Sequence, residues 1–202
     1  MVIVAAALDR KLLRDLLRLW PQALAIALVV AAGFATLILG TGAGRSLQET
    51  RAAYYDRYAF ADVFVSLKRA PKGLAQRIRE IPGVAAADVR IVRGTLLDVP
   101  GLKEPASGIA ISLPSHAATN LNKLHLRSGR LPQTDKPDEA AVSEGFARAN
   151  GLTVGSRFSA ILDGRKRTLR ITGLALSPEY IYAMSPGDLV PDDRRFAVIW
   201  MP

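Results

Sequence analysis

Three alternating glycines, Gly40, Gly42 and Gly44, follow an apolar run in the segment LILGTGAGRS and are the first candidates for chemistry. A phosphate-binding turn has a strand, a glycine-rich loop and the start of a helix in this order. The spacing here is Gly-x-Gly-x-Gly, which lacks the two-residue gap of the dinucleotide fingerprint. A long uncharged run precedes the segment and a charged, tyrosine-rich stretch follows it. We therefore interpret it as the outer end of a membrane helix.

Other residue types that carry chemistry form no constellation. His116 and His125 stand nine positions apart and match no metal-binding spacing, and the chain has no cysteine for thiolate ligands or disulfides. No nucleophile elbow or phosphate loop is present. The acidic pairs Asp138-Glu139 and Asp192-Asp193 follow prolines in polar stretches, which predicts solvated turns. We expect no catalytic, cofactor or metal site; an enzyme ranks third among the hypotheses.

The elements that position these residues begin with a long apolar segment. Residues 19–44 carry no charged side chain, and as a helix they would extend about 39 Å, enough to cross a hydrocarbon core of about 30 Å. Pro21 predicts an elbow where a new helix begins, so we assign residues 21–44 to a transmembrane helix. A cleavable signal peptide, with Thr41 and Ala43 near the cleavage site, stays open as an alternative, although the apolar run exceeds the usual length.

Residues 1–20 combine leucines at helical spacing with basic side chains. This pattern predicts an interfacial amphipathic helix on the cytoplasmic face, with an ordinary surface helix as the alternative. The basic residues before the span place the N-terminus in the cytoplasm and everything after about Gly44 outside. The net charge of +9 is scattered along the chain, with GRKR (164–167) the one dense run. We thus expect contact with membrane lipid and no nucleic-acid partner; GRKR is read as a solvated hairpin tip, with a binding patch as the alternative.

A stripe of small residues marks the predicted span. Ala32, Thr36, Gly40 and Gly44 recur every four positions, and such spacing lets helices approach closely in lipid. We expect this face to pack against other membrane helices.

The remaining sequence predicts an α+β fold: one N-terminal transmembrane helix followed by a periplasmic α/β domain, residues 61–202, with a mixed or antiparallel sheet and β-hairpins. Residues 45–60 continue as a helix leaving the membrane. Alternation and turn residues predict a helix laid on a sheet, a second helix from about Ser143 ending at Asn150-Gly151, and a hairpin turning at Asp163-Gly164. The predicted strands are 61–70, one or two within 84–101, 106–115 and the two arms of 155–176; the first helix is 71–83.

Several segments in order carry a resemblance to a known family. They are FADVFVSLKRAP, LRSGRLP and the run from DEAAVSEGFARANGL through LALSPEYIY, of which Gly129 to Tyr182 is the most specific part. The chain resembles the N-terminal part of FtsX-like, MacB-like ABC transporter permeases, in which the first membrane helix precedes a periplasmic core domain.

The resemblance implies a location in the bacterial inner membrane and several partners. Such permeases usually dimerise and pair with a separate cytoplasmic ABC ATPase, whose hydrolysis moves the outer domains against lipoprotein, lipid, peptide or drug cargo. The first helix would pack beside the remaining permease helices or a second permease copy. The family continues beyond RRFAVIWMP, which suggests a fragment, a truncated product or one piece of a split permease. The rival hypothesis is a single-span binding or adaptor protein without an ATPase.

Overall fold

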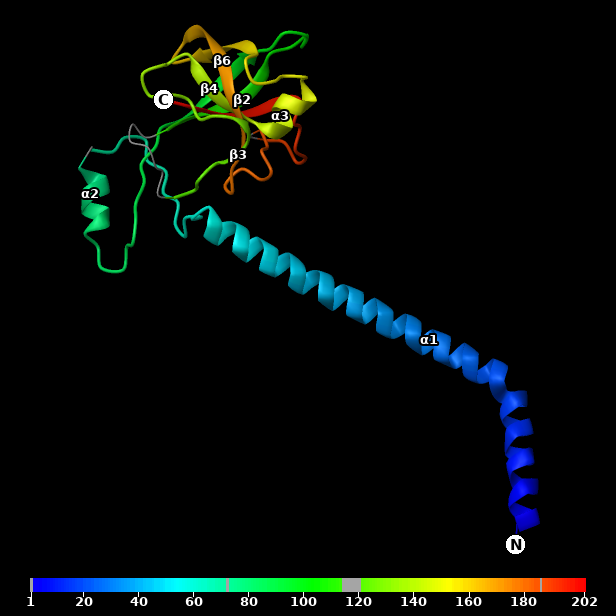
Figure 1. Cartoon of the computed structure of the whole chain (residues 1–202). Coiled ribbons are helices and arrows are strands. Elements are labelled where there is room, and N and C mark those ends of the chain that lie inside the picture. Colours follow the sequence, from blue (N-terminus) through cyan, green and yellow to red (C-terminus); the bar gives the residue numbers. More distant parts are fainter. Residues whose placement is uncertain (1, 72, 114–120, 186) are drawn as a thin grey trace. The chain divides into compact units, whose positions relative to one another are not determined.

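The computed structural model describes residues 2–71, 73–113, 121–185 and 187–202. Its first element is α1 (Val2–Arg57), one helix that contains Pro21. The sequence predicts a new helix at Pro21, whereas α1 runs on through it. Figure 1 shows α1 bent within its blue part, as expected when a proline inside a helix removes a backbone hydrogen bond.

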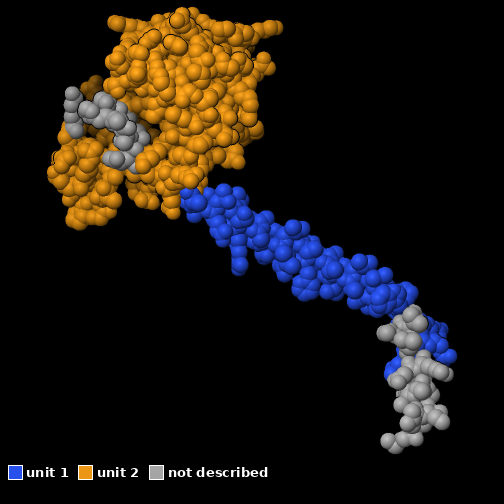
Figure 2. Space-filling view, viewed as in Figure 1, with its two compact units in different colours: residues 1–53 blue, residues 54–202 orange. Residues whose placement is uncertain are grey.

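The chain divides into two compact units, residues 1–53 and residues 54–202 (Figure 2). Every side chain from Arg18 to Ala53 is exposed. Within the described chain, residues 18–57 form the one helix long and apolar enough to cross a membrane, judged by length and composition alone. A signal sequence near the N-terminus would have the same length and composition.

The second unit contains seven strands, which are β1 (Val92–Asp98), β2 (Ala106–Ser112), β3 (His125–Gly129), β4 (Glu139–Ser143), β5 (Arg157–Leu162), β6 (Arg165–Leu176) and β7 (Phe196–Met201). Their order in the sheet is β3-β6-β4-β7-β2-β1-β5, and β5 also pairs with β6. The six strands other than β3 therefore close into a ring, and β3 is added to the edge of β6. The pairs β2–β7 and β4–β6 are parallel and the others antiparallel, so the sheet is mixed.

Strand β6 makes the closure possible because of its length. Residues 165–170 pair with β5, whereas residues 170–175 pair with β4 along the opposite edge. Beyond the end of β5, residues 173–176 pair with β3. One long strand thus joins the closed sheet to the added strand (Figure 1).

The core lies inside this ring. Alternate residues of the strands, including Leu97, Ala160, Leu169 and Ile199, are fully buried there, together with Phe146 of the short helix α3 (Glu144–Ala149). A second apolar cluster lies around Trp200, Ile111 and Ala175. Strand β7 contributes to both clusters, which explains its uninterrupted apolar run FAVIW: a strand covered on both faces does not alternate.

The local predictions met different outcomes. The hairpin is confirmed, with Asp163 and Gly164 at φ 48° and 75° as a type I′ turn requires. The helix before Asn150 is also confirmed, and Gly151 has a positive φ. The strand at 61–70 is wrong, because the segment is irregular and no described strand pairs with it. Of the one or two strands predicted within 84–101, one forms, namely β1, and residues 84–91 before it are irregular.

Three further corrections concern packing. Helix α2 (Leu74–Arg79) forms as predicted but buries no residue, so it is not the helix laid on the sheet. That place belongs to α3, which packs on β4, β6 and β7. Strands β3, β4 and β7 lie where the sequence predicts no strand, because short strands next to turns lack a clear alternation.

Candidate functional site: the joint between the end of α1 and strand β3

Helix α1 ends in a tight backbone motif within the second unit. The N–H of Phe60 donates to the carbonyl of Tyr55 at 2.9 Å, and the N–H of Ala59 donates to Asp56 at 3.2 Å. Ala59 has φ 48°. These are the two hydrogen bonds and the left-handed residue of a Schellman motif, in which glycine is the usual residue. The motif fixes the direction in which the chain leaves the helix.

The segment that leads into β3 is bonded to this helix end. The N–H groups of Asn122 and Lys123 donate to the carbonyls of Ala59 and Tyr58, each at 2.8 Å. The side-chain oxygen of Asn122 accepts a hydrogen bond from the N–H of Ala61 at 3.0 Å, and Asn122 is 7% exposed. Asn122 has φ 50°, a region that asparagine tolerates better than most residues. Three hydrogen bonds thus hold two segments that lie more than 60 positions apart in the sequence.

Aromatic side chains pack around the end of α1, and one of them, Tyr58, reaches β3. The rings of Tyr54 and Tyr58 lie 4.8 Å apart, and Tyr55 stacks on Phe60 at 4.5 Å. The Tyr58 hydroxyl shares a 2.5 Å hydrogen bond with Nδ1 of His125, the first residue of β3. The end of α1 is therefore tied by main-chain bonds to the segment that leads into β3 and by the Tyr58–His125 pair to β3 itself, while the other rings pack the helix end on itself. We call this set of contacts the joint.

Two glycines allow β3 to lie close against β6. Gly129 and Gly173 are register partners, and Gly129 has φ 75°. A Cβ on Gly129 would lie 2.1 Å from the Thr172 carbonyl oxygen, and one on Gly173 would lie 2.4 Å from the Arg130 oxygen. No other residue fits either position without movement of the backbone.

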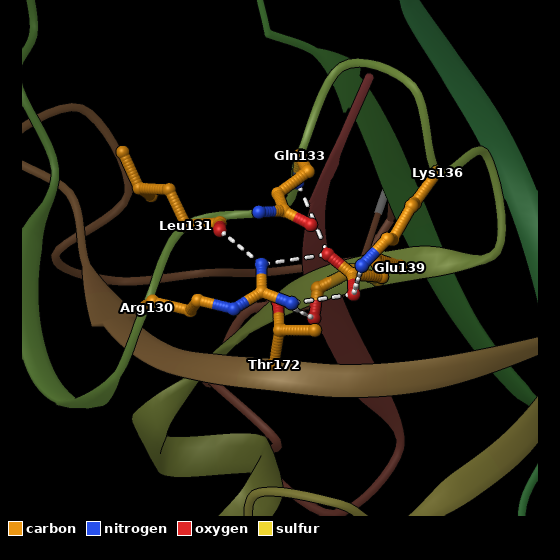
Figure 3. Close-up of polar contacts among 7 residues, drawn as sticks. Arg130, Leu131, Gln133, Lys136, Glu139 and Thr172 are labelled. Carbon is orange, nitrogen blue, oxygen red and sulfur yellow. Dashed lines mark hydrogen bonds and ion pairs between the residues drawn. The ribbon is translucent and has the colours of Figure 1, made fainter.

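The far end of β3 is locked by a carboxylate clasp (Figure 3). The Arg130 guanidinium donates to both oxygens of Glu139, from Nη1 at 2.7 Å and from Nη2 at 2.5 Å. The N–H of Gln133 donates to the same carboxylate at 3.1 Å, and Lys136 Nζ lies 3.9 Å away. Glu139 begins β4 and is 3% exposed. The clasp therefore fixes the loop between β3 and β4 to the first residue of β4.

The electrostatics of the clasp keep it charged. Hydrogen bonding from Arg130, opposed by burial and assisted by the Gln133 N–H, lowers the pKa of Glu139 to about 2. The same hydrogen bond raises the pKa of Arg130. Both partners are thus ionised at neutral pH, in the bidentate geometry that strengthens such pairs.

A second ion pair ties an irregular segment to the closed sheet. Arg90 contacts the Glu179 carboxylate just after β6. Beside it, burial and the Glu179 charge raise the pKa of Tyr180 to about 12. Tyr180 therefore stays a neutral phenol and packs on the cluster around Trp200.

The structure places the residues singled out in the sequence as follows. Residues 37–46 are entirely helical, so the phosphate-turn alternative is excluded. The stripe Ala32, Thr36, Gly40 and Gly44 is exposed, and Thr36 Oγ1 donates to the Ala32 carbonyl at 2.9 Å. Its packing role stays a prediction. His116 lies outside the described residues, whereas His125 belongs to the joint.

The sequence did not predict the side-chain contacts of Arg130 and Glu139. Glu139 is not in a solvated turn but buried and paired, because Arg130 folds over it. The signal was present as a Gly-Arg-x-Pro turn followed by an acid that begins an apolar strand. Asp192 does cap a turn, accepting from the N–H of Arg194 at 2.9 Å. Within the described ranges, no three His, Asp or Glu side chains gather as a metal site.

The fold defines the class of the chain: a long apolar N-terminal helix followed by a sheet-rich α+β domain. The chain belongs to the family of MacB-like periplasmic core domains, whose model matches residues 23–202. This confirms the resemblance to MacB-like and FtsX-like ABC transporter permeases. The family is a component of transporter permeases, which implies a membrane context.

Comparisons with individual proteins add less. A search of curated proteins gave no match. Among solved structures, one similar chain is a domain of a "putative Permease protein" from Porphyromonas gingivalis, with 18% identity and a TM-score of 0.34. The match covers 64% of this chain and 50% of that one, so this chain spans half the length of its neighbour. At this TM-score the likeness carries no argument about the fold.

Proposed function

We propose that the chain supplies the first membrane helix and the outer domain of an ABC transporter permease, and that the domain relays motion to cargo or partners. Its N-terminus lies in the cytoplasm, residues 21–44 span the inner membrane, residues 45–60 leave it and residues 61–202 lie in the periplasm. A separate cytoplasmic ATPase drives the motion. The remaining permease helices, or a second copy, pack against the stripe Ala32, Thr36, Gly40 and Gly44.

The joint is the observation that carries this proposal. A relay needs a stiff connection, because a flexible linker would absorb any displacement of the helix end. Here the last turn of α1 is bonded through Tyr58 and Asn122 to the start of β3. Strand β3 in turn pairs with β6, the strand that joins the closed sheet. Displacement at residue 58 is therefore passed to the sheet.

The absence of cysteine in the sequence allows a direct test of orientation. Leu189→Cys, in a side chain that is 96% exposed, reports on the domain, and Leu12→Cys, at 64%, reports on the N-terminal helix. With a membrane-impermeant maleimide on spheroplasts, Leu189→Cys should react at once and Leu12→Cys only after lysis. The opposite labelling would overturn the orientation.

The relay is tested with the joint itself. The tagged chain is purified with its ATPase from native membranes, and the double variant Tyr58→Phe/Asn122→Ala is compared with Tyr182→Phe, whose ring is 76% exposed. We expect both variants to retain the ATPase, and only the joint variant to lose the response of ATP hydrolysis to conditions that engage the outer domain. A chain that never copurifies with an ATPase would favour the adaptor hypothesis instead.

A further inference from the structure

Two arginines stand opposite each other on the outer face of the β5–β6 hairpin. The register pairs Arg157 with Arg170, and Ser159 with Thr168. Residues two positions apart on a strand share a face, and the intervening Leu169 is fully buried in the core. All four side chains therefore point away from the core on adjoining positions. We call this set the arginine tetrad.

The tetrad has no counter-charge within the part of the chain that the structure describes. None of its four side chains takes part in an ion pair or a side-chain hydrogen bond there. The two carboxylates at neighbouring register positions are already engaged. Asp98, opposite Ser159, is bound to Lys166 at 2.6 Å, and Glu139, opposite Arg170, is held by Arg130.

Repulsion between the two arginines lowers the stability of the folded domain unless an anion binds between them. Like charges directly opposite on antiparallel strands destabilise the pair. Three members of the tetrad also line a pocket of about 190 Å³ on this face, whose lining residues are Asp98, Pro100, Arg157, Phe158, Ser159 and Thr168. The pocket thus presents the Arg157 guanidinium, two hydroxyls and the Asp98 carboxylate, whose charge Lys166 already pairs. Arg170 does not line the pocket but lies beside it as the register partner of Arg157.

We propose that the arginine tetrad binds the phosphate group of an anionic ligand, either a phospholipid headgroup or a soluble phosphate ester. Guanidinium groups match the spacing of phosphate oxygens and donate in pairs, and hydroxyls complete the donor set. A phosphate between Arg157 and Arg170 also cancels their mutual repulsion. The site is independent of the relay and of the orientation in the membrane.

The tetrad is distinct from the basic hairpin tip. The tip, GRKR at 164–167, consists of the turn residue Gly164 and the first three residues of β6. All four residues are exposed, and the Lys166 ammonium is paired with Asp98. The structure therefore favours the solvated-tip interpretation for GRKR and moves the binding hypothesis to the strands behind it.

The test uses the full chain in neutral detergent, at about 50 mM salt because screening weakens such contacts. Isothermal titration calorimetry measures binding of inorganic phosphate, glycerol phosphate and monomeric dihexanoyl phosphatidylglycerol. We expect Arg157→Gln/Arg170→Gln to lose at least about tenfold in affinity for each probe that binds. Arg157→Lys/Arg170→Lys keeps the charge but not the paired donors, so its affinity should lie between those of the wild type and the double glutamine variant.

The matched control is Arg93→Gln/Arg148→Gln, which removes the same charge from two other exposed arginines. Its affinity for each probe should lie within about twofold of that of the wild type, because binding depends on the tetrad and not on the net charge of the domain. Tighter binding of phosphatidylglycerol than of glycerol phosphate assigns the site to lipid, and equal binding assigns it to a soluble ester.

Thermal unfolding separates binding from a purely structural role. Without ligand, the Arg157→Gln/Arg170→Gln variant should unfold at a higher temperature than the wild type, because the repulsion is gone. Phosphate should then raise the unfolding temperature of the wild type only. The proposal is overturned if no phosphate probe binds saturably, if the control variant loses as much affinity, or if the double glutamine variant is less stable.

Discussion

Replacing Glu139 with glutamine removes the charge from the clasp that locks the loop between β3 and β4. The side chain keeps its size, so the change isolates the charge-assisted bonds from Arg130. Glutamine can still accept hydrogen bonds through its carbonyl oxygen. Its N–H₂ group, however, faces the Arg130 guanidinium, which contains only donors, so no hydrogen bond forms there. We expect the domain to lose stability without losing its fold.

The magnitude follows from the pKa of Glu139. It falls from 4.5 to about 2, and each pKa unit is worth about 1.4 kcal/mol, so the ionised form stabilises the fold by at most about 3.4 kcal/mol. The Arg130 side chain is 48% exposed, and solvent screening reduces the figure to about 2 kcal/mol.

The pH dependence has a definite sign. Because the pKa of Glu139 is lower in the folded state, its contribution is fully present above the ordinary carboxyl pKa of 4.5 and is lost as the pH falls towards 2. The difference between wild type and Glu139→Gln should therefore be about 2 kcal/mol at pH 7 and should shrink below pH 4.5.

Urea unfolding of the full chain in detergent measures this difference. Trp200 is 2% exposed in the core and reports the domain, while Trp20 in α1 is replaced by phenylalanine in every variant. Glu144→Gln is the control, because its partner Arg127 is 54% exposed and such surface pairs contribute less than about 1 kcal/mol. A loss below about 0.5 kcal/mol at pH 7, or a loss that does not change with pH, would refute the reasoning.

Three further predictions concern the backbone and the joint, measured by the same unfolding assay. Gly129→Ala should lower the free energy of unfolding by at least about 3 kcal/mol, because its Cβ would meet the Thr172 carbonyl oxygen. Gly164 is equally left-handed but has no atom near its Cβ position, so Gly164→Ala should lower it by about 1 kcal/mol. Equal losses would contradict the steric account. Tyr58→Phe should cost about 1 kcal/mol by removing the bond to the imidazole; no change would mean that water replaces it. Ala59→Gly should stabilise by about 1 kcal/mol, since φ 48° suits glycine, and a loss of stability would contradict the Schellman assignment.

Some features of this domain were readable in the sequence because their causes are local. The hairpin at Asp163-Gly164 follows from two alternating runs and a dipeptide that accepts positive φ at both positions. The helix end at Asn150-Gly151 has an equally local reason. The two alternating arms became β5 and β6, and the inward positions of β5, Phe158 and Ala160, are buried.

Other features could not be predicted from the sequence, because they depend on contacts with segments distant in the chain. The apolar residues at 63–67 have strand composition, but no described strand lies beside them, so they stay irregular and exposed. Strand β7 shows no alternation because β2 and β4 cover it on both edges and apolar clusters lie on both faces. Composition alone cannot report which neighbours a segment will find.

The sequence by itself determined the long uncharged helix, the α+β class and the family, because length, charge gaps and the order of short motifs are properties of the chain. Only the tertiary structure decided that six strands close into a ring, that Asn122 and His125 meet the end of α1, and that Glu139 is a buried partner of Arg130. Each of these depends on the register between segments far apart in the chain, and hydrogen bonding and packing set that register once the chain has folded.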